Sequence, residues 1–179
     1  MEHLKLSKIV KKICILGIEG VGKTSLIRRF VDDQFDDSYL TTIGAKISKK
    51  NISLSSESEV ELIIWDIEGV KVGEGVIESY FIGASCFIIV GDMSRKGSLA
   101  SLVTIFRENL KDFHEKSLFV FALNKSDLVN LEDGFKYKEV LTQELGVGSS
   151  VFLTSAKVGR GVEELFVDVA EGLIDECSK

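Results

Sequence analysis

The residues of this chain that are best suited to chemistry lie near the N-terminus, where positions 17–24 read GIEGVGKT. The three glycines in this stretch allow successive backbone N–H groups to curl around a phosphate. The ammonium group of Lys23 can reach the outer phosphates of a nucleotide, and the hydroxyl group of Thr24 can ligate Mg²⁺. A helix that begins at this point adds the partial positive charge of its N-terminus. The GxxxxGK[ST] spacing therefore predicts a phosphate-binding loop.

The elements that must position this loop follow an alternating pattern along the chain. Short apolar, β-rich runs alternate with segments of helical period, which predicts an α/β protein with a mostly parallel sheet. We expect six strands and about five helices on both faces of the sheet, in a single domain that spans residues 1–179. The predicted strands are 9–16, 43–54, 60–66, 87–91, 118–123 and 151–154, and the predicted helices include 23–31, 98–113, 137–145 and 162–174. Ligands of such sheets bind at the carboxyl ends of the strands, so we expect the functional residues just after them.

Composition excludes several classes of protein. The 179 residues carry 22 lysines and arginines against 28 acidic residues, a net charge of −6, which argues against a nucleic-acid binder. The three cysteines are widely spaced, so neither a disulfide framework nor a zinc site is indicated, and we expect a cytoplasmic protein. No run approaches the roughly 18 apolar residues that a membrane helix needs.

Two further motifs follow later predicted strands: residues 124–127 read NKSD and residues 155–157 read SAK. With the phosphate-binding loop, they resemble the elements of the Ras-like small GTPases. In order and spacing they are most similar to the Rab branch and its Rab-like prokaryotic relatives, from about residue 9 to residue 174. The resemblance implies the G-domain form of the P-loop NTPase fold, a monomer that binds GDP or GTP with Mg²⁺, and protein partners that include effectors, an exchange factor and an activating protein.

The NKSD motif bears on which base is bound. The carboxylate of Asp127 can accept two parallel hydrogen bonds from the ring N–H and the amino group of guanine, whereas adenine offers no such pair on that edge. The resemblance further implies that the Lys125 stem and Phe35 sandwich the base, that Asn124 ties this loop to the phosphate-binding loop, and that the Ala156 N–H meets the guanine oxygen.

Two segments resemble the switch loops of the family, near residues 33–46 and 66–81. By resemblance, Thr42 closes onto Mg²⁺ and the γ-phosphate, Asp66 of the WDxxG segment holds Mg²⁺ through water, and the Gly69 N–H meets the γ-phosphate. Loops of this kind change order with the bound nucleotide.

The resemblance thus implies three sets of site residues. The nucleotide-binding set is Gly17, Glu19, Gly20, Val21, Gly22, Lys23, Thr24, Ser25, Phe35, Thr42, Asp66, Gly69, Asn124, Lys125, Asp127, Ser155, Ala156 and Lys157. The Mg²⁺ set is Thr24, Thr42 and, through water, Asp66. The catalytic set is Lys23, Thr42 and Gly69.

The second switch segment departs from the family. Rab-type sequences usually read WDTAGQE here, whereas this chain reads WDIEGVK, so Val70 replaces the glutamine that orients the attacking water. This replacement predicts slow intrinsic hydrolysis. Glu19 and Glu68 also place acids near the phosphates, and a carboxylate about 6–8 Å from the γ-phosphate would be repelled by roughly 2–3 kcal/mol. Alternatively, both side chains turn into water or pair with Lys71 or Arg160, or one of them positions the water.

Two rival functions remain open at this point. The first is a scaffold that binds guanine nucleotide without turning it over, and the second, disfavoured by Asp127, is a P-loop kinase or ATPase. Arg28 and Arg29 are interpreted as surface charges, so we expect no arginine finger within the chain. The last five residues, DECSK, match no lipidation motif, and we expect at most peripheral membrane association.

Overall fold

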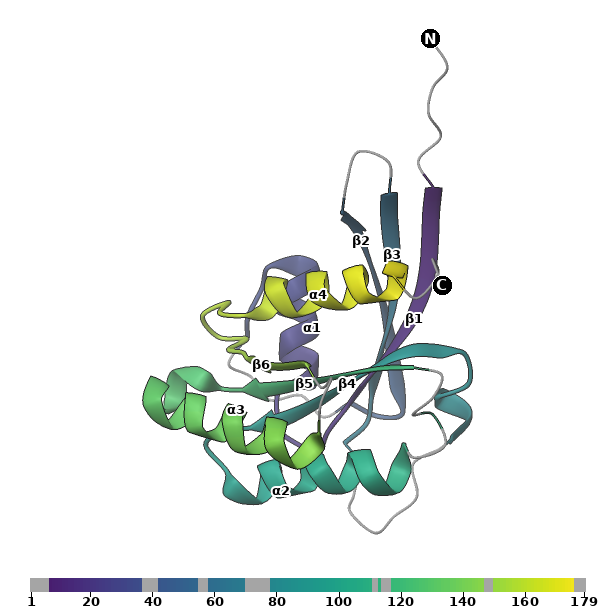
Figure 1. Cartoon of the computed structure of the whole chain (residues 1–179). Helices are drawn as coiled ribbons and strands as arrows, with labels where there is room; N and C mark the ends of the chain where they lie inside the picture. The colour runs from purple at the N-terminus through teal and green to yellow at the C-terminus, as the bar shows by residue number, and fades with distance from the viewer. Residues whose placement is uncertain are drawn as a thin grey trace.

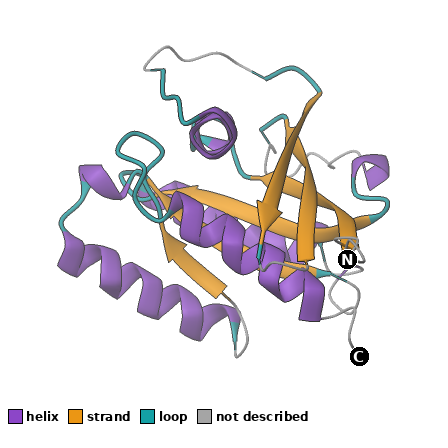
Figure 2. Cartoon of the chain, turned by 90° about the horizontal axis from the view of Figure 1, so that it is seen from above, coloured by secondary structure: helices purple, strands orange, loops and turns teal. Residues whose placement is uncertain are grey.

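The chain forms one six-stranded sheet in the order β2-β3-β1-β4-β5-β6 (Figure 1). The computed structural model describes residues 7–36, 42–54, 58–69, 78–110, 113, 117–146 and 150–175. The strands are β1 (Ser7–Leu16), β2 (Ala45–Ser53), β3 (Ser58–Ile67), β4 (Ala84–Asp92), β5 (Leu118–Asn124) and β6 (Ser150–Leu153). Only the pairing of β2 with β3 is antiparallel, so the predicted mostly parallel sheet is confirmed. Figure 2 shows its twist, with the strands at one edge running crosswise to those at the other.

Helices cover both faces of the sheet, as predicted. The helices α1 (Lys23–Asp32) and α4 (Val162–Asp175) lie against one face, and α2 (Lys96–Thr104) and α3 (Leu131–Leu145) lie against the other (Figure 1). The described residues contain these four α-helices, compared with the expected number of about five. No helix among them is long and apolar enough to cross a membrane.

Two helices differ from their predicted extents. The predicted helix at 98–113 is shorter, because α2 gives way to a π-helical turn at Ile105–Asn109. Helix α3 begins six residues earlier than predicted. Its first turns expose Leu131 and Phe135, so they lack the buried apolar stripe on which the prediction depended. Asn130 caps this start, since its side-chain oxygen accepts a hydrogen bond of 2.8 Å from the Asp133 N–H.

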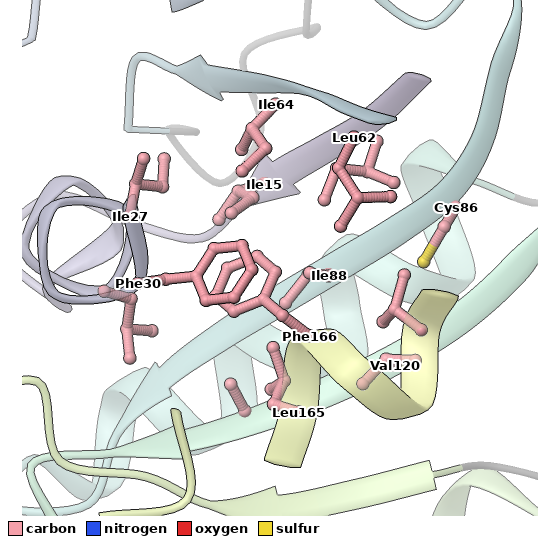
Figure 3. Packing of buried hydrophobic residues seen from close by; sticks show 14 of the residues in the cluster. Ile15, Ile27, Phe30, Leu62, Ile64, Cys86, Ile88, Val120, Leu165 and Phe166 are labelled. Carbon is pink, nitrogen blue, oxygen red and sulfur yellow. The ribbon is translucent and has the colours of Figure 1, made fainter. Parts of the chain in front are cut away.

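Two hydrophobic cores hold the helices on the sheet. On the α1/α4 face, the rings of Phe30 and Phe166 stack with centroids 3.9 Å apart, above Ile15 and Ile88 of the central strands (Figure 3). On the α2/α3 face, Phe87 of β4 packs within a second cluster of aromatic rings. Each fully buried side chain of this size stabilises the fold by about 1.5–3 kcal/mol. Strands β4 and β5 are covered on both sides, which explains their continuous apolar sequence.

The parallel strands bring five loops to one edge of the sheet. In the register of the sheet, Ile15 at the end of β1 pairs with Asp66, Asp92 pairs with Asn124, and Leu123 pairs with Leu153. Strands β1, β3, β4, β5 and β6 therefore all end at this edge. The predicted motifs follow β1, β3, β5 and β6, so the topology gathers them in one place.

Candidate nucleotide-binding site

The phosphate-binding loop connects β1 to α1 and uses backbone conformations that favour glycine. Gly20 and Gly22 have φ values of 76° and 97°, in the left-handed region. A side chain at Gly17 would place its Cβ atom 2.5 Å from the carbonyl oxygen of Val90, so the loop passes directly against β4. Val21 is fully buried beneath the loop, and Ser25 follows in the first turn of α1.

Lys23 is the buried cation of the loop. Its side chain is only 7% exposed, and its Nζ atom donates to the carbonyl oxygens of Gly17 at 2.8 Å and Ile18 at 3.3 Å. Burial lowers the pKa of Lys23 to about 8, although the nearby carboxylates, Asp66 foremost, oppose this shift. Among the described residues no carboxylate forms an ion pair with Lys23, so a bound phosphate would bring a negative charge into direct contact with this ammonium group.

Three oxygen-bearing side chains meet beside Lys23. The Thr24 hydroxyl donates to Asp66 Oδ2 at 2.5 Å, lies 2.9 Å from the Thr42 hydroxyl, and Thr42 in turn donates to Asp66 at 3.4 Å. Asp66 is 1% exposed, and its second oxygen, Oδ1, has no hydrogen-bond partner among the described residues. Burial raises the pKa of Asp66, and the hydrogen bond from Thr24 partly opposes this rise.

This donor set fits Mg²⁺. The ion prefers oxygen ligands and is commonly bound by one or two carboxylates with retained waters. A divalent cation or its water shell would satisfy the orphaned Asp66 oxygen and relieve the cost of burying that charge. Thr24, Thr42 and Asp66 are therefore the residues that would hold the metal.

The NKSD loop is tied directly to the phosphate-binding loop. Asn124 Nδ2 donates to the Val21 carbonyl at 2.9 Å, and Lys125 Nζ donates to the Gly20 carbonyl at 2.8 Å. Lys125 has a φ of 61°, which makes the turn into the short 3₁₀ helix at Ser126–Leu128. Hydrogen bonds thus join the NKSD loop and the phosphate-binding loop into one unit.

The SAK loop joins the same unit. The Ser155 hydroxyl donates to Asp127 Oδ1 at 2.5 Å and so fixes the carboxylate that the resemblance assigns to guanine. The Ala156 N–H, assigned by resemblance to the guanine oxygen, here donates to Asn124 Oδ1 at 3.2 Å. Lys157 is exposed at the surface.

Arg29 is not merely the surface charge that the sequence suggested. From α1 its guanidinium donates to the carbonyl oxygens of Ala156 at 2.9 Å and Lys157 at 3.0 Å. Its side chain is 21% exposed. Arg29 therefore supports the backbone of the SAK loop from below.

Sequence reasoning also missed Asp92, which lies at the end of β4. Its side chain is fully buried, and its Oδ2 atom accepts from Lys125 Nζ at 2.7 Å and from Arg95 Nε at 2.8 Å. Ser94 donates to its other oxygen through both its backbone N–H and its hydroxyl. Burial alone would raise the pKa of Asp92, but the hydrogen bonds from Lys125 and Ser94 outweigh it, and the pKa lies below its usual value. A charged residue that ends a continuous apolar strand was the available signal.

The described parts of the two switch segments touch each other. Glu68 N–H donates to the Gly44 carbonyl at 2.8 Å, and the Gly44 N–H donates back to the Glu68 carboxylate at 3.0 Å. Glu68 thus pairs with Gly44, a partner that none of the alternatives proposed from the sequence included. Gly69 lies so close to the P-loop that a Cβ atom there would be 2.7 Å from the Glu19 nitrogen. Residues 37–41 and 70–77, and the prediction about Val70 with them, lie outside the described residues.

The hydrogen bonds of the NKSD loop described above do not include Phe35. It is partly buried and packs against the core on the α1/α4 face. The structure therefore gathers the P-loop, the Mg²⁺ set, and the NKSD and SAK residues in one network, while Phe35 adjoins it through the core.

A phosphate-binding loop before a helix, at the carboxyl edge of this sheet, defines a P-loop nucleotide-binding protein. Comparison with known proteins narrows this class: residues 12–175 match the model of the Ras family. The chain belongs to the Ras family, whose members include the Rab GTPases. It is 32% identical over 165 residues to the GTP-binding protein ypt5 of Schizosaccharomyces pombe, covering 92% of this chain and 78% of that protein. It is 33% identical to human Ras-related protein Rab-31, over 89% of this chain and 80% of the relative. The yeast Ypt/Rab-type GTPase YPT7 is 28% identical, over 94% and 84% respectively.

Proposed function

We propose that this chain is a Rab-like guanine-nucleotide switch that binds GDP and GTP with Mg²⁺ and slowly hydrolyses GTP to GDP. The observation that carries the proposal is the hydrogen-bonded unit formed by the phosphate loop and the base loop. Asn124 and Lys125 each donate to a carbonyl of the phosphate loop, so both ends of a nucleotide would meet one rigid surface. Asp127, oriented by Ser155, would accept the two guanine donors.

The same geometry supports chemistry at the γ-phosphate. When bound, Mg²⁺ would neutralise charge on the phosphate oxygens. The buried ammonium group of Lys23 would stabilise the charge that develops there, and the Gly69 N–H would hold the γ-phosphate beside the P-loop. Thr42 would complete the shell around the phosphate and help to hold the attacking water. Because Val70 has no donor or acceptor to orient that water, we expect slow turnover.

A partner protein would then set the rate and read the result. In this family, an arginine supplied by an activating protein raises the rate by roughly 10³–10⁵. The Ile43 side chain is 89% exposed beside Thr42, and Ile47 of β2 is 50% exposed. These apolar side chains offer an effector a surface whose neighbourhood depends on the γ-phosphate. The Rab and Ypt names of the relatives support a role as a signalling or trafficking regulator. We expect the chain to act as a monomer. Membership of a prokaryotic Rab-like branch stays a prediction.

The test is a single-turnover experiment with the full chain. The protein is loaded with GTP and Mg²⁺, freed of excess nucleotide, and sampled over several hours for the GTP and GDP that remain bound. We expect slow appearance of bound GDP and a clear acceleration in Val70→Gln, with Lys136→Ala as an exposed control. Failure to retain guanine nucleotide, or displacement of GTP by equimolar ATP, would overturn the proposal.

The same experiment decides the one alternative that the sequence favours, a scaffold without turnover. Val70 supports that alternative, whereas the preserved cluster of Thr24, Thr42 and Asp66 supports a working switch. GTP that stays intact in both the wild-type protein and Val70→Gln would overturn intrinsic hydrolysis and leave the scaffold or a switch that depends strictly on a partner.

A further inference from the structure

The outer side of the phosphate-binding loop carries three successive carbonyl groups, each held by a side chain from another loop. The Val21 carbonyl accepts from Asn124, and the Gly20 carbonyl accepts from Lys125, both residues of the NKSD motif. The third, the Glu19 carbonyl, accepts from an Arg95 terminal nitrogen at 3.0 Å. Arg95 follows β4 and belongs to neither the predicted site nor the family motifs quoted above.

These three bonds determine where the loop's N–H groups point. In a planar trans peptide, the carbonyl of one residue and the N–H of the next point in opposite directions. Holding the carbonyls of residues 19, 20 and 21 outward therefore turns the N–H groups of residues 20, 21 and 22 inward. Successive inward N–H groups, with glycines in the left-handed region, form the nest that binds phosphate.

Arg95 is itself held in place at two points. Its Nε atom pairs with the buried carboxylate of Asp92 at 2.8 Å, and its backbone N–H donates to the Asp92 carbonyl at 3.1 Å. The same carboxylate oxygen of Asp92 also pairs with Lys125 at 2.7 Å. The planar guanidinium fork can bind the carboxylate and the Glu19 carbonyl at once, which a lysine cannot do with the same geometry. The terminal nitrogen atoms of Arg95 also lie 3.6 and 4.0 Å from where a Cβ atom of Gly20 would be, so the guanidinium covers the first peptide of the nest.

We propose that Arg95 is a positioning residue that fixes the Glu19–Gly20 peptide of the phosphate-binding loop and thereby slows the release of guanine nucleotide. This inference rests on the proposed nucleotide binding. It extends the carbonyl support given by Asn124 and Lys125 by one peptide, toward the end of the loop that faces Gly69 and the second switch segment. Asp92 links all of this support, because it anchors both Arg95 and Lys125.

The experiment measures release of a fluorescent GDP analogue from the wild-type protein, Arg95→Ala and Arg95→Lys, with Mg²⁺ present and unlabelled GDP in excess. We expect Arg95→Ala to release the analogue at least about 10-fold faster, as the loss of a hydrogen bond from a charged donor implies, and Arg95→Lys to fall between. Competition assays should show a larger loss of affinity for GDP than for GMP, because GDP places more phosphate oxygens in the nest.

Arg107→Ala is the matched control. Arg107 is 56% exposed against 45% for Arg95, and it likewise makes one ion pair, with Glu144, and one bond to a backbone carbonyl. It joins the π-helical turn after α2 to α3, so its loss should leave release unchanged.

The outcomes separate the two levels of inference. A wild-type protein that retains no GDP would overturn the proposed function and this inference with it. Retention by the wild-type protein with equal release from Arg95→Ala would overturn this inference alone. Unchanged release with slower single-turnover hydrolysis would also overturn it, because Arg95 would then act on the reaction and not on the loop.

Discussion

At the scale of single residues, one hydrogen bond orients Asp127, the residue that we propose selects guanine. The Ser155 hydroxyl occupies one carboxylate oxygen from the side of the SAK loop. The carboxylate is thereby oriented before a base arrives, so less order has to be imposed on binding. Recognition of the base would then depend on the Asp127 side chain presenting only hydrogen-bond acceptors.

Replacing Asp127 with Asn should therefore change which base is preferred. The amide would present a donor to a guanine donor, so we expect at least about a 100-fold loss of GDP affinity, as sites built for paired hydrogen bonds show. Xanthine carries a carbonyl where guanine has its amino group, so xanthosine diphosphate should gain affinity. Competition against a fluorescent GDP analogue measures both, and unchanged GDP affinity in the variant would contradict the assignment.

Glu68 is a second residue whose role the structure redefines. Its carboxylate accepts the Gly44 N–H, two residues after Thr42, while its own N–H donates to the Gly44 carbonyl. The side chain thus extends the pairing of β2 with β3 into the switch segments. This bond directs the acid toward the first switch segment, which weakens the idea of simple repulsion of the γ-phosphate.

We expect Glu68→Ala to lower the free energy of unfolding by about 1 kcal/mol, the typical net value of one hydrogen bond. Glu68→Gln should retain most of that stability, because the amide oxygen still accepts. Urea unfolding of the GDP-bound proteins measures the difference. Equal losses in the two variants would show that charge, and not the bond to Gly44, is what matters.

Part of the site could be predicted from the sequence because its residues are contiguous. Lys23 and Thr24 share one loop, which its spacing predicts, and Asn124, Lys125 and Asp127 share another, which the resemblance to the family identifies. The roles of Arg29 and Arg95 could not be predicted from the sequence, because their partners are backbone carbonyls 76 to 128 positions away. No local sequence pattern indicates such contacts.

At the scale of elements, the strands were predictable because burial on both faces leaves a continuous apolar sequence, as in β4 and β5. The helix starts were less so. The first turns of α3 are set by the Asn130 cap and not by an apolar stripe, and α2 ends in a π-helical turn that helical periodicity does not anticipate. Caps and turns of this kind depend on single polar contacts, which the hydrophobic pattern does not contain.

Two glycines test how the elements are joined. Gly161, at the start of α4, has a φ of 65°, and a Cβ atom there would overlap the Leu153 carbonyl oxygen at the end of β6. Gly97 lies within α2 with open space around it. We expect Gly161→Ala to destabilise the protein by at least about 2 kcal/mol. The control, Gly97→Ala, should stabilise it by about 0.5–1 kcal/mol. Urea unfolding compares them, and similar values would contradict the close approach of β6 to α4.

The loop after β4 has a predictable dependence on pH. The pKa of Asp92 lies below the usual aspartate value of 3.8, so the folded protein keeps this carboxylate charged where the unfolded chain binds a proton. Its stabilising contribution is complete above that value and is lost as the pH falls below it. The unfolding free energies of wild type and Asp92→Asn, measured with GDP, should differ most above pH 4 and converge in more acidic solution. A difference in unfolding free energy that grows as the pH falls would have the opposite sign and would contradict this prediction.

At the scale of the whole molecule, the site is a junction between the loops that follow five strands of the sheet, β1, β3, β4, β5 and β6. The P-loop contacts the loops after β3, β4 and β5, and α1 supports the loop after β6 through Arg29. A ligand bound at this junction would contact several of these loops at once, so we expect the stability of the fold to be linked to occupancy of the site.

Removal of Mg²⁺ tests this linkage. Asp66 is buried with one oxygen unpartnered, and its raised pKa reflects the cost of holding a charge there, which a divalent cation would offset. A ligand at about 100 times its Kd stabilises the folded state by about 2.7 kcal/mol, and for a domain of this size that raises the Tm by roughly 5–10 °C. We therefore expect EDTA to lower the Tm of the GDP-bound protein by several degrees. Asp66→Asn should be less sensitive to EDTA, because a neutral amide oxygen attracts the cation more weakly than a carboxylate does. Glu139→Gln, at an exposed side chain of α3, should behave as wild type. If the wild-type Tm is the same with and without Mg²⁺, the cluster of Thr24, Thr42 and Asp66 is not a metal site. The unpartnered Asp66 oxygen must then accept hydrogen bonds from water or from the nucleotide itself.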